Sequence, residues 1–261
     1  MDHVLVAAVA FVASALTLYS GFGLGTLLLP AFALFFPAPV AVAATGAIHL
    51  INNLFKGALL RRRADWRIVL RFGLPAVPAA IAGAWLLGML GATERLFAWE
   101  LGGRTHGPTA AGLTVGVLMI VFALLELQPA FQRLRAPARL MPVGGLLTGF
   151  FGGLTGQQGA LRSMFLLKSG MDAAAFIATG VMIAVLVDLS RMPTYVAAFA
   201  EAGVTLGERD LALIGTGAIA ALAGAWLGAL YVGKMTIDLV RRIVAGLMVL
   251  VGAALASGLV G

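Results

Sequence analysis

A polar cluster broken by glycines lies inside a long apolar run at residues 154–163. It reads Leu-Thr-Gly-Gln-Gln-Gly-Ala-Leu-Arg-Ser. In a lipid bilayer, every backbone N–H and C=O must find a partner within the protein, so such a break needs a protein-lined or water-lined setting. Amide, guanidinium and hydroxyl groups donate hydrogen bonds to the oxygens of an anion. The cluster is therefore the first candidate for a binding site, with Gln157, Gln158, Arg162 and Ser163 as candidate ligands.

An earlier and less polar counterpart, Ser-Gly-Phe-Gly-Leu-Gly-Thr, lies at residues 20–26. Its glycines permit a sharp turn and close backbone approach, so Gly21, Gly23 and Gly25 are candidates to contact a ligand through the backbone. If both broken runs fold as hairpins, half-helices begin near Thr26 and Leu161. Their N-terminal N–H groups and positive dipole ends would then point at a common site, which favours an anion.

The sequence allows two interpretations of Arg162, as a ligand contact or as a structural residue. A guanidinium within the membrane is costly unless it is paired or faces water, and it offers a bidentate fork to a sulfonate, sulfite or carboxylate. Alternatively, it marks a hairpin tip nearer the interface, or forms a structural pair with Asp188 or Glu126. Asn52 and Asn53 lie mid-span, where buried amides need partners, either a substrate, unwound backbone or a neighbouring helix.

Four further residues are candidates for coupling or gating. Asp188 and Arg191 are three residues apart, so a helix places them as an ion pair, and this reading is preferred over a proton-coupling carboxylate. His49 is expected to be a packing residue rather than a proton relay. Lys56 is expected to snorkel toward a helix end. Lys56 and Arg191 correspond roughly in the two halves of the chain, as do Asn53 and Asp188.

The elements that position these residues are membrane helices. The hydrophobic fraction is 61%, the charged fraction 11% and the mean hydropathy +1.01. Apolar stretches of about 18 residues or more suit helices that cross the bilayer rather than barrel strands. The expected elements are two broken runs, 4–36 and 140–169, and six spans, 40–60, 68–91, 109–127, 172–192, 210–232 and 241–260.

Charge placement predicts the orientation. The net charge is +7, but Lys and Arg cluster in short loops, which indicates membrane topology rather than binding of nucleic acid. The basic segments after residue 60 and at 133–139 are predicted to be cytoplasmic, and the loops 92–108 and 193–209 external. The chain has no cysteine and three histidines, so disulfides and thiolate metal sites are excluded, and no metal or cofactor is expected.

An internal repeat divides the chain. Ala82-Gly83-Ala84-Trp85-Leu86 recurs at residues 223–227, and the glycine cluster at 20–26 aligns with 155–161. The predicted division is a first repeat at 1–127, a basic cytoplasmic connector at 128–139 and a second repeat at 140–261, within one integral membrane domain. If each broken run crosses the membrane, each half has four crossings. If each run is instead re-entrant, three transmembrane helices follow it and the halves form an inverted repeat. The inverted arrangement is preferred, because it places the basic loop 233–242 inside.

These features resemble the TauE/SafE family of sulfite and organosulfonate exporters. The resemblance is based on the paired glycine signatures and on Pro37 and Pro39, which end the first broken run. It also rests on Asn52-Asn53, the basic loop after residue 60 and the repeated Ala-Gly-Ala-Trp. It implies a polytopic all-α permease for small sulfur-containing anions such as sulfite or sulfoacetate. Leu24 interrupts the first glycine run, and Gln157, Gln158 and Ala160 replace glycines in the second. These departures affect the identity of the substrate more than the fold.

The predicted function is secondary transport of such an anion by alternating access, in a multi-pass protein of a bacterial inner membrane. The alternatives are an anion channel, a carrier for another small organic anion, or a membrane sensor that does not transport. A membrane-embedded enzyme is disfavoured, because the sparse acids form no recognisable catalytic constellation. The expected partners are the anionic substrate, the lipid bilayer, a coupling proton and a second copy in a homodimer, with no nucleic acid.

Overall fold

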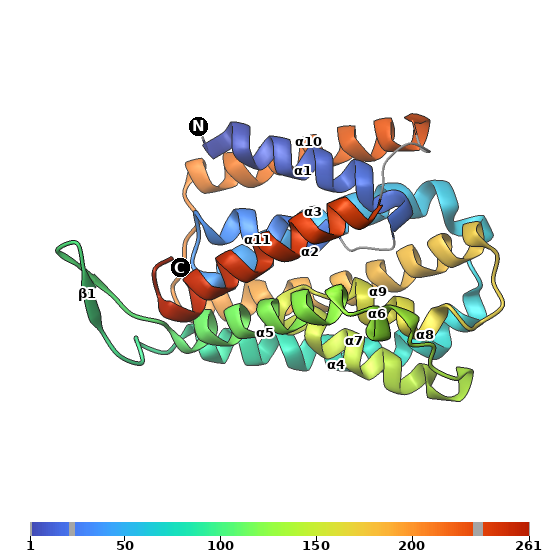
Figure 1. The fold of residues 1–261 in the computed structure, drawn as a ribbon, viewed down its shortest axis with the longest axis horizontal. Coiled ribbons are helices and arrows are strands. Elements are labelled where there is room, and N and C mark those ends of the chain that lie inside the picture. Colours follow the sequence, from blue (N-terminus) through green and yellow to red (C-terminus); the bar gives the residue numbers. More distant parts are fainter. Residues whose placement is uncertain (1, 21–23, 232–236, 261) are drawn as a thin grey trace.

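The computed structural model describes residues 2–20, 24–231 and 237–260. Its long helices run roughly along one direction, and both termini lie toward the end that carries a β-hairpin (Figure 1). The first half contains α1 (Asp2–Ser20), α2 (Leu24–Ala33), α3 (Ala38–Leu60), η1 (Arg61–Arg63), α4 (Trp66–Gly91), β1 (Trp99–Leu101), β2 (Arg104–His106) and α5 (Ala110–Leu127). The remainder contains α6 (Pro129–Arg133), η2 (Ala138–Leu140), α7 (Met141–Thr155), α8 (Gly159–Leu166), α9 (Ala173–Glu201), α10 (Glu208–Tyr231) and α11 (Ile237–Ser257).

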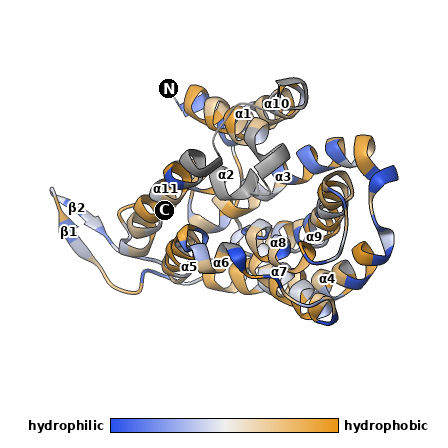
Figure 2. Ribbon diagram, turned by 45° about the vertical axis from the view of Figure 1, so that its right-hand side comes forward, coloured by the Kyte–Doolittle hydropathy of each residue, from blue (hydrophilic) through white to orange (hydrophobic). Residues whose placement is uncertain are grey.

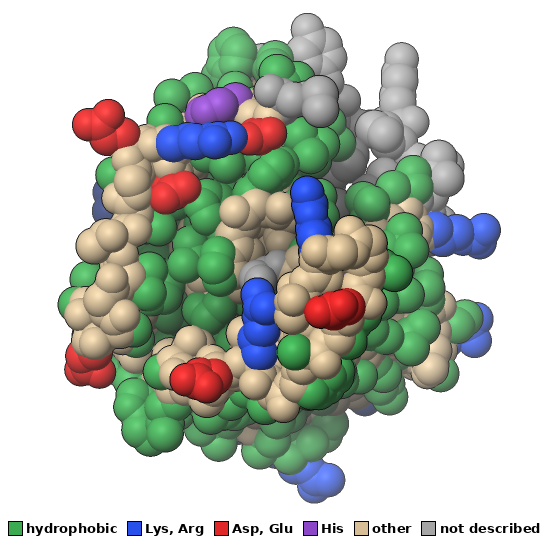
Figure 3. Space-filling view, turned by 90° about the vertical axis from the view of Figure 1, so that its left-hand side faces the viewer, with side chains coloured by type: hydrophobic (Ala, Val, Ile, Leu, Met, Phe, Trp, Pro, Cys, Tyr) green, Lys and Arg blue, Asp and Glu red, His purple; other side chains and the backbone are tan. Residues whose placement is uncertain are grey.

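Five helices within the described part of the chain are long and apolar enough to cross a membrane. They are α3 with η1, α4, α5, α9 and α10, five of the six predicted spans. The described residues of the sixth, α11, form a shorter apolar helix from Arg242 to Ser257. Hydrophilic residues gather at the connection between α3 and α4, which holds the three arginines of η1 (Figure 2). The opposite end face carries both acidic and basic side chains around a hollow (Figure 3).

Helices α7 and α8 form a hairpin. Eight residues of α8 extend about 12 Å, well short of the roughly 30 Å of a hydrocarbon core. The backbone N–H of Ala136, before α7, donates to the carbonyl of Met164 in α8 at 3.2 Å. Near the start of α7, Gly144 packs against the ring of Phe165. The second broken run therefore turns back and ends beside its own beginning.

Helices α1 and α2 fold back in a comparable way. Gly217 of α10 identifies the arrangement, because a Cβ placed there would lie 3.1 Å from Val6 and 3.4 Å from Phe32. Val6 lies near the start of α1 and Phe32 near the end of α2, so the two ends lie together. The first broken run thus also begins and ends in one region of the molecule.

The first helix of each half packs on the other half. α1 lies against α10, and α7 lies against α4. Both contacts use the glycine of the repeated Ala-Gly-Ala-Trp motif. A Cβ on Gly83 would collide with the carbonyl of Phe150 in α7, and one on Gly224 would collide with the carbonyl of Phe11 in α1. The two copies of the motif therefore occupy corresponding places in the structure.

Corresponding helices of the two halves cross in opposite directions. Between α3 and α9, Gly46 lies beside Met192 whereas Gly57 lies beside Met182. Between α5 and α11, Gly112 faces Leu255 and Gly116 faces Gly252. In both pairs, residue numbers rise along one helix as they fall along the other, so each pair is antiparallel.

Two details differ from the sequence prediction. Helix α9 continues to Glu201, so residues 193–201 of the predicted external loop are helical. Pro193 lies inside this helix and lacks an N–H, a feature that membrane helices tolerate when nearby groups satisfy the freed carbonyl. The predicted loop 92–108 contains the antiparallel β1–β2 hairpin, which no sequence pattern had indicated. Trp99 of β1 anchors it by donating from Nε1 to the Ser257 carbonyl at 2.9 Å.

Candidate functional site

The polar cluster of the second broken run forms the turn between α7 and α8. α7 ends at Thr155, and Gly156 follows with φ of +76°, a left-handed conformation that glycine adopts at little steric cost. The Gly156 N–H donates to the Gly152 carbonyl at 3.0 Å and closes the last turn of α7. Gln157 and Gln158 come next, and Gln158 is the N-cap residue of α8. The chain can therefore reverse within a few residues.

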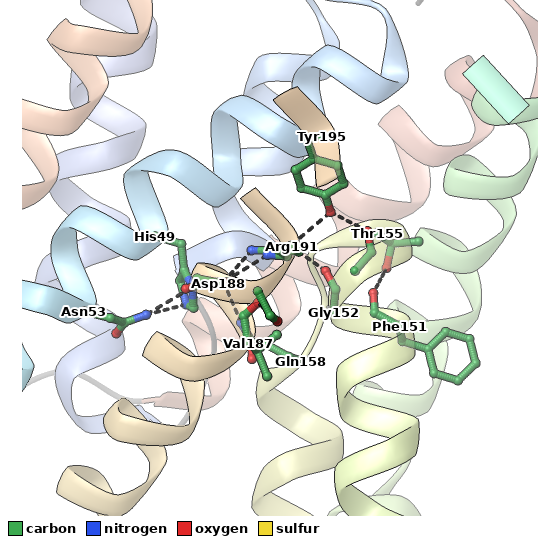
Figure 4. A network of polar contacts seen from close by, with 12 residues as sticks. His49, Asn53, Phe151, Gly152, Thr155, Gln158, Val187, Asp188, Arg191 and Tyr195 are labelled. Atoms are coloured by element: carbon green, nitrogen blue, oxygen red, sulfur yellow. Dashed lines mark hydrogen bonds and ion pairs between the residues drawn. The ribbon is translucent and has the colours of Figure 1, made fainter. Parts of the chain in front are cut away.

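Asp188 of α9 lies at the centre of a buried polar network (Figure 4). Its Oδ1 accepts from Arg191 Nε at 3.0 Å and lies 2.7 Å from Arg191 Nη2 as an ion pair. Oδ1 also accepts from Gln158 Nε2 at 3.1 Å. Oδ2 lies 2.6 Å from Nδ1 of His49 on α3. One carboxylate thus joins α3, α9 and the N-terminus of α8.

Arg191 and Tyr195 hydrogen-bond to the last turn of α7, which precedes the α7–α8 turn. Arg191 Nη1 donates to the carbonyl of Gly152, and the Tyr195 hydroxyl donates to the carbonyl of Gly153. Carbonyls in the last turn of a helix form the negative end of its dipole. The cation therefore lies at the C-terminal end of α7, while the carboxylate of Asp188 binds the N-cap side chain of α8. The ion pair therefore complements both helix dipoles, with its cation at the negative C-terminal end of α7 and its carboxylate at the positive N-terminal end of α8.

Helix α3 presents a polar face to the interior. The residues on it recur at helical spacing and are all buried, namely Thr45, His49, Asn52, Asn53 and Lys56. Asn53 Nδ2 lies 3.0 Å from His49 Nδ1, which extends the network around Asp188. Asn52 Oδ1 accepts from the Ser14 hydroxyl of α1 at 3.1 Å. One asparagine therefore belongs to the central network, and the other links two helices.

Several polar atoms at the α7–α8 turn have no hydrogen-bond partner among the described residues. Both amide atoms of Gln157 are in this state, although the residue is only 3% exposed. Gln158 Oε1 and Arg162 Nη1 also lack a hydrogen-bond partner within the described structure. Leaving buried polar atoms unpaired costs roughly 1–3 kcal/mol each. A ligand that offered complementary groups would recover part of that cost.

Arg162 lies in α8, just beyond this turn, and packs against α9. Its Nε would lie 3.4 Å from a Cβ placed on Gly180, so the guanidinium runs along bare helix backbone. Within the described residues Arg162 forms no ion pair, and Asp188 is paired with Arg191 and His49 instead. No cluster of three or more His, Asp or Glu side chains suited to a metal ion occurs in the described part of the chain.

A comparison with protein-family models matches residues 6–255 to the family described as sulfite exporter TauE/SafE. The match extends from α1 into α11 and covers nearly the whole chain. The chain belongs to the TauE/SafE family. Membership and the five apolar helices make it a multi-pass membrane transporter. A comparison with curated proteins finds no match.

In this TauE/SafE protein, the predicted site residues fall into separate groups. The residues that share one network are His49, Asn53, Gln158, Asp188 and Arg191. The predicted ion pair between Asp188 and Arg191 is confirmed. Ser163 donates its hydroxyl to the Gly159 carbonyl at 2.9 Å, within α8. Gly25 lies in α2, and Gly21 and Gly23 fall outside the described residues.

The prediction that Lys56 snorkels to an interface is wrong. Lys56 is only 5% exposed. Its side chain therefore does not reach the surface, although other residues of α3, such as Leu54 and Leu59, are exposed. The sequence indicated the length of the apolar span around Lys56, but not that this side chain is buried inside the molecule.

Tyr195 contributes to the candidate site, but sequence reasoning missed it. It occurs four residues after Arg191 and seven after Asp188, so the three side chains share one face of α9. This spacing was a usable signal. The acceptors of Arg191 and Tyr195 are backbone carbonyls of Gly152 and Gly153, which no side-chain pattern identifies.

Proposed function

We propose that this TauE/SafE protein is a secondary transporter that moves a small sulfur-containing oxyanion, sulfite or an organosulfonate, across a bacterial inner membrane by alternating access. The observation that carries the proposal is the buried amide of Gln157 before the N-terminus of α8, neither atom of which has a hydrogen-bond partner among the described residues. Backbone N–H groups at a helix N-terminus and the positive end of its dipole favour an anion at this place. The family description, sulfite exporter, supports the class of anion.

The binding chemistry follows from the donors at the break. The Gln157 amide supplies a neutral donor, and Arg162 supplies a positive charge with an unpaired Nη1 within the described structure. An oxyanion accepts hydrogen bonds from both and needs no donor of its own. Arg191 is not assigned to the ligand, because Asp188 and the carbonyl of Gly152 already occupy its guanidinium.

The architecture that we propose is an inverted repeat with two re-entrant hairpins. Support comes from the antiparallel crossings of α3 with α9 and of α5 with α11, since a two-fold axis in the membrane plane reverses the direction of corresponding helices. The return of α8 to the beginning of α7 supports the re-entrant path. Inverted repeats with broken helices at the midplane are a recurring design in secondary transporters.

The test is flux in proteoliposomes that contain the purified full chain. We expect saturable uptake of labelled sulfite or of a sulfonate such as sulfoacetate. Gln157→Ala should raise the KM about tenfold or more, because a hydrogen bond to a charged group contributes roughly 1.5–3 kcal/mol. Gln128→Ala is the matched control, since Gln128 is exposed and lies between α5 and α6.

A second pair of variants tests the charge. Arg162→Ala should also raise the KM, whereas Arg133→Ala, which removes an exposed arginine from α6, should leave it unchanged. Absence of flux of every sulfur anion from the wild-type protein would overturn the proposed function. Unchanged kinetics in Gln157→Ala or Arg162→Ala would remove that residue from the site and leave the transport activity in place.

A further inference from the structure

The contact between His49 and Asp188 spans the two halves of the molecule. His49 Nδ1 and Asp188 Oδ2 are 2.6 Å apart, and the residues are 4% and 0% exposed. His49 lies on α3 and Asp188 on α9, the antiparallel pair at the centre of the fold. Histidine is the side chain whose ordinary titration falls within physiological pH. Its position beside a carboxylate makes this contact a place where one proton can be gained or lost.

The charges of the network around His49 already balance, so a proton on His49 would add a net positive charge. Asp188 is paired with Arg191, so the network is neutral when His49 is neutral. α2 has no charged residue, and the charges of α10 are all in its first turn. The other titratable or charged groups on helices near this contact are Tyr195 and Glu201 on α9, Arg162 on α8, Lys56 on α3, Glu126 on α5, and Arg67 and Arg71 on α4.

The same network touches the candidate anion site. Gln158, which binds Asp188 Oδ1, is the neighbour of Gln157 and the N-cap residue of α8. While Asp188 is a carboxylate, its negative charge lies near the helix terminus that would attract an anion. A proton shared between His49 and Asp188 changes the net charge of the network from zero to +1. One proton therefore balances the charge of one monovalent anion.

We propose that the His49–Asp188 pair binds the coupling proton, so that one proton and one monovalent oxyanion move together and the cycle is electroneutral. This inference rests on the proposed transport function. The proton enters from water on one side, is held between His49 Nδ1 and Asp188 Oδ2 while the anion is bound, and leaves to water on the other side. No covalent or redox step is involved.

The test uses the reconstituted full chain and methanesulfonate, a monovalent anion that stays ionised over the working pH range and so cannot carry the proton itself. Sulfonate exchange at equal pH on both sides reports transport. Net accumulation under an inward proton gradient reports coupling. A gradient of one pH unit should sustain about tenfold accumulation. When one proton and one anion move together, a tenfold inward proton gradient balances a tenfold outward anion gradient at equilibrium. A membrane potential set with potassium and valinomycin should leave that accumulation unchanged.

The wild-type measurement alone decides the inference. Exchange without accumulation by the proton gradient would overturn proton coupling and leave the transport function standing, whereas absence of exchange would overturn the transport function itself. Dependence of accumulation on membrane potential would overturn the one-to-one stoichiometry.

Variants then locate the proton. His49→Gln should lose the tenfold accumulation, and His3→Gln, which changes an exposed histidine on α1, should keep it. Asp188→Asn provides the second variant, with the elution volume of both proteins as the check of folding. Full accumulation in a folded His49→Gln protein would overturn the assignment to this pair. Loss of exchange together with accumulation would place His49 in the anion site and would also overturn it.

Discussion

Asp188 and Arg191 are buried charges that the broken helix stabilises. Both residues are 0% exposed, and a buried charge is costly unless it is paired and hydrogen-bonded. Asp188 is bound by Arg191, His49 and Gln158, and Arg191 also donates to the Gly152 carbonyl. The pair therefore holds helices in place and does not act through its charges alone. It fixes α9 against the end of one short helix and the beginning of the next.

Removing the cation should be expensive. Arg191→Met leaves Asp188 buried without its main partner, which should lower the free energy of unfolding by about 3–5 kcal/mol. The unfolding temperature in detergent can be followed by intrinsic fluorescence, since the chain has four tryptophans. Arg191→Met combined with Asp188→Asn should recover part of the loss, because the uncompensated charge is gone. An unfolding temperature equal to that of the wild type in Arg191→Met would contradict this account.

At the scale of elements, glycine sets how closely the halves approach. Along α4 and α7, Gly83, Gly149 and Gly153 each have a backbone carbonyl of the other helix where a Cβ would lie. Small residues at such contacts allow membrane helices to pack backbone against backbone. Gly224 makes the corresponding contact between α10 and α1. The hairpins are thus held by close packing on the opposite half.

Alanine at either of the corresponding glycines should destabilise the protein. Gly83→Ala and Gly224→Ala each place a methyl group against a carbonyl in a neighbouring helix, and overpacking of this kind typically costs about 1–3 kcal/mol. Gly215→Ala in α10 is the matched control, because its Cβ would meet no atom of the described residues within 4 Å. The control should unfold at the wild-type temperature or slightly above it, as alanine has the higher helix propensity. Equal unfolding temperatures for all three variants would contradict the close-packing argument.

At the scale of the whole molecule, the apolar spans and the repeated motifs were predictable because they are local patterns. The Ala-Gly-Ala-Trp repeat correctly marked two corresponding contacts. The contacts of Asp188 were not predictable, since His49 lies 139 residues away and Gln158 lies 30 residues away along the chain. The burial of Lys56 likewise depends on which helices surround α3. Sequence patterns identified the polar residues of the candidate site except Tyr195, and tertiary packing determined their partners.

The proposed inverted repeat predicts how the loops are placed in the membrane, which helix packing alone does not determine. It requires corresponding loops of the two halves to face opposite sides, so the connection from α3 to α4 should be cytoplasmic and that from α9 to α10 external. The chain has no cysteine, so single substitutions can be labelled without background. In intact cells, an impermeant maleimide should label Thr205→Cys and Thr105→Cys, both at exposed positions.

Arg62→Cys and Arg139→Cys, which are exposed at the predicted cytoplasmic end, should react only after the cells are permeabilised. The decisive comparison is between Arg62 and Thr205, since they lie in corresponding connections. Labelling of both from the same side would mean that the halves are parallel. Because α3 and α9 are antiparallel in the structure, that outcome would also require the two-fold relation between the halves to be abandoned. Opposite labelling would support a single central site, reached through the first hairpin from outside and through the second from the cytoplasm.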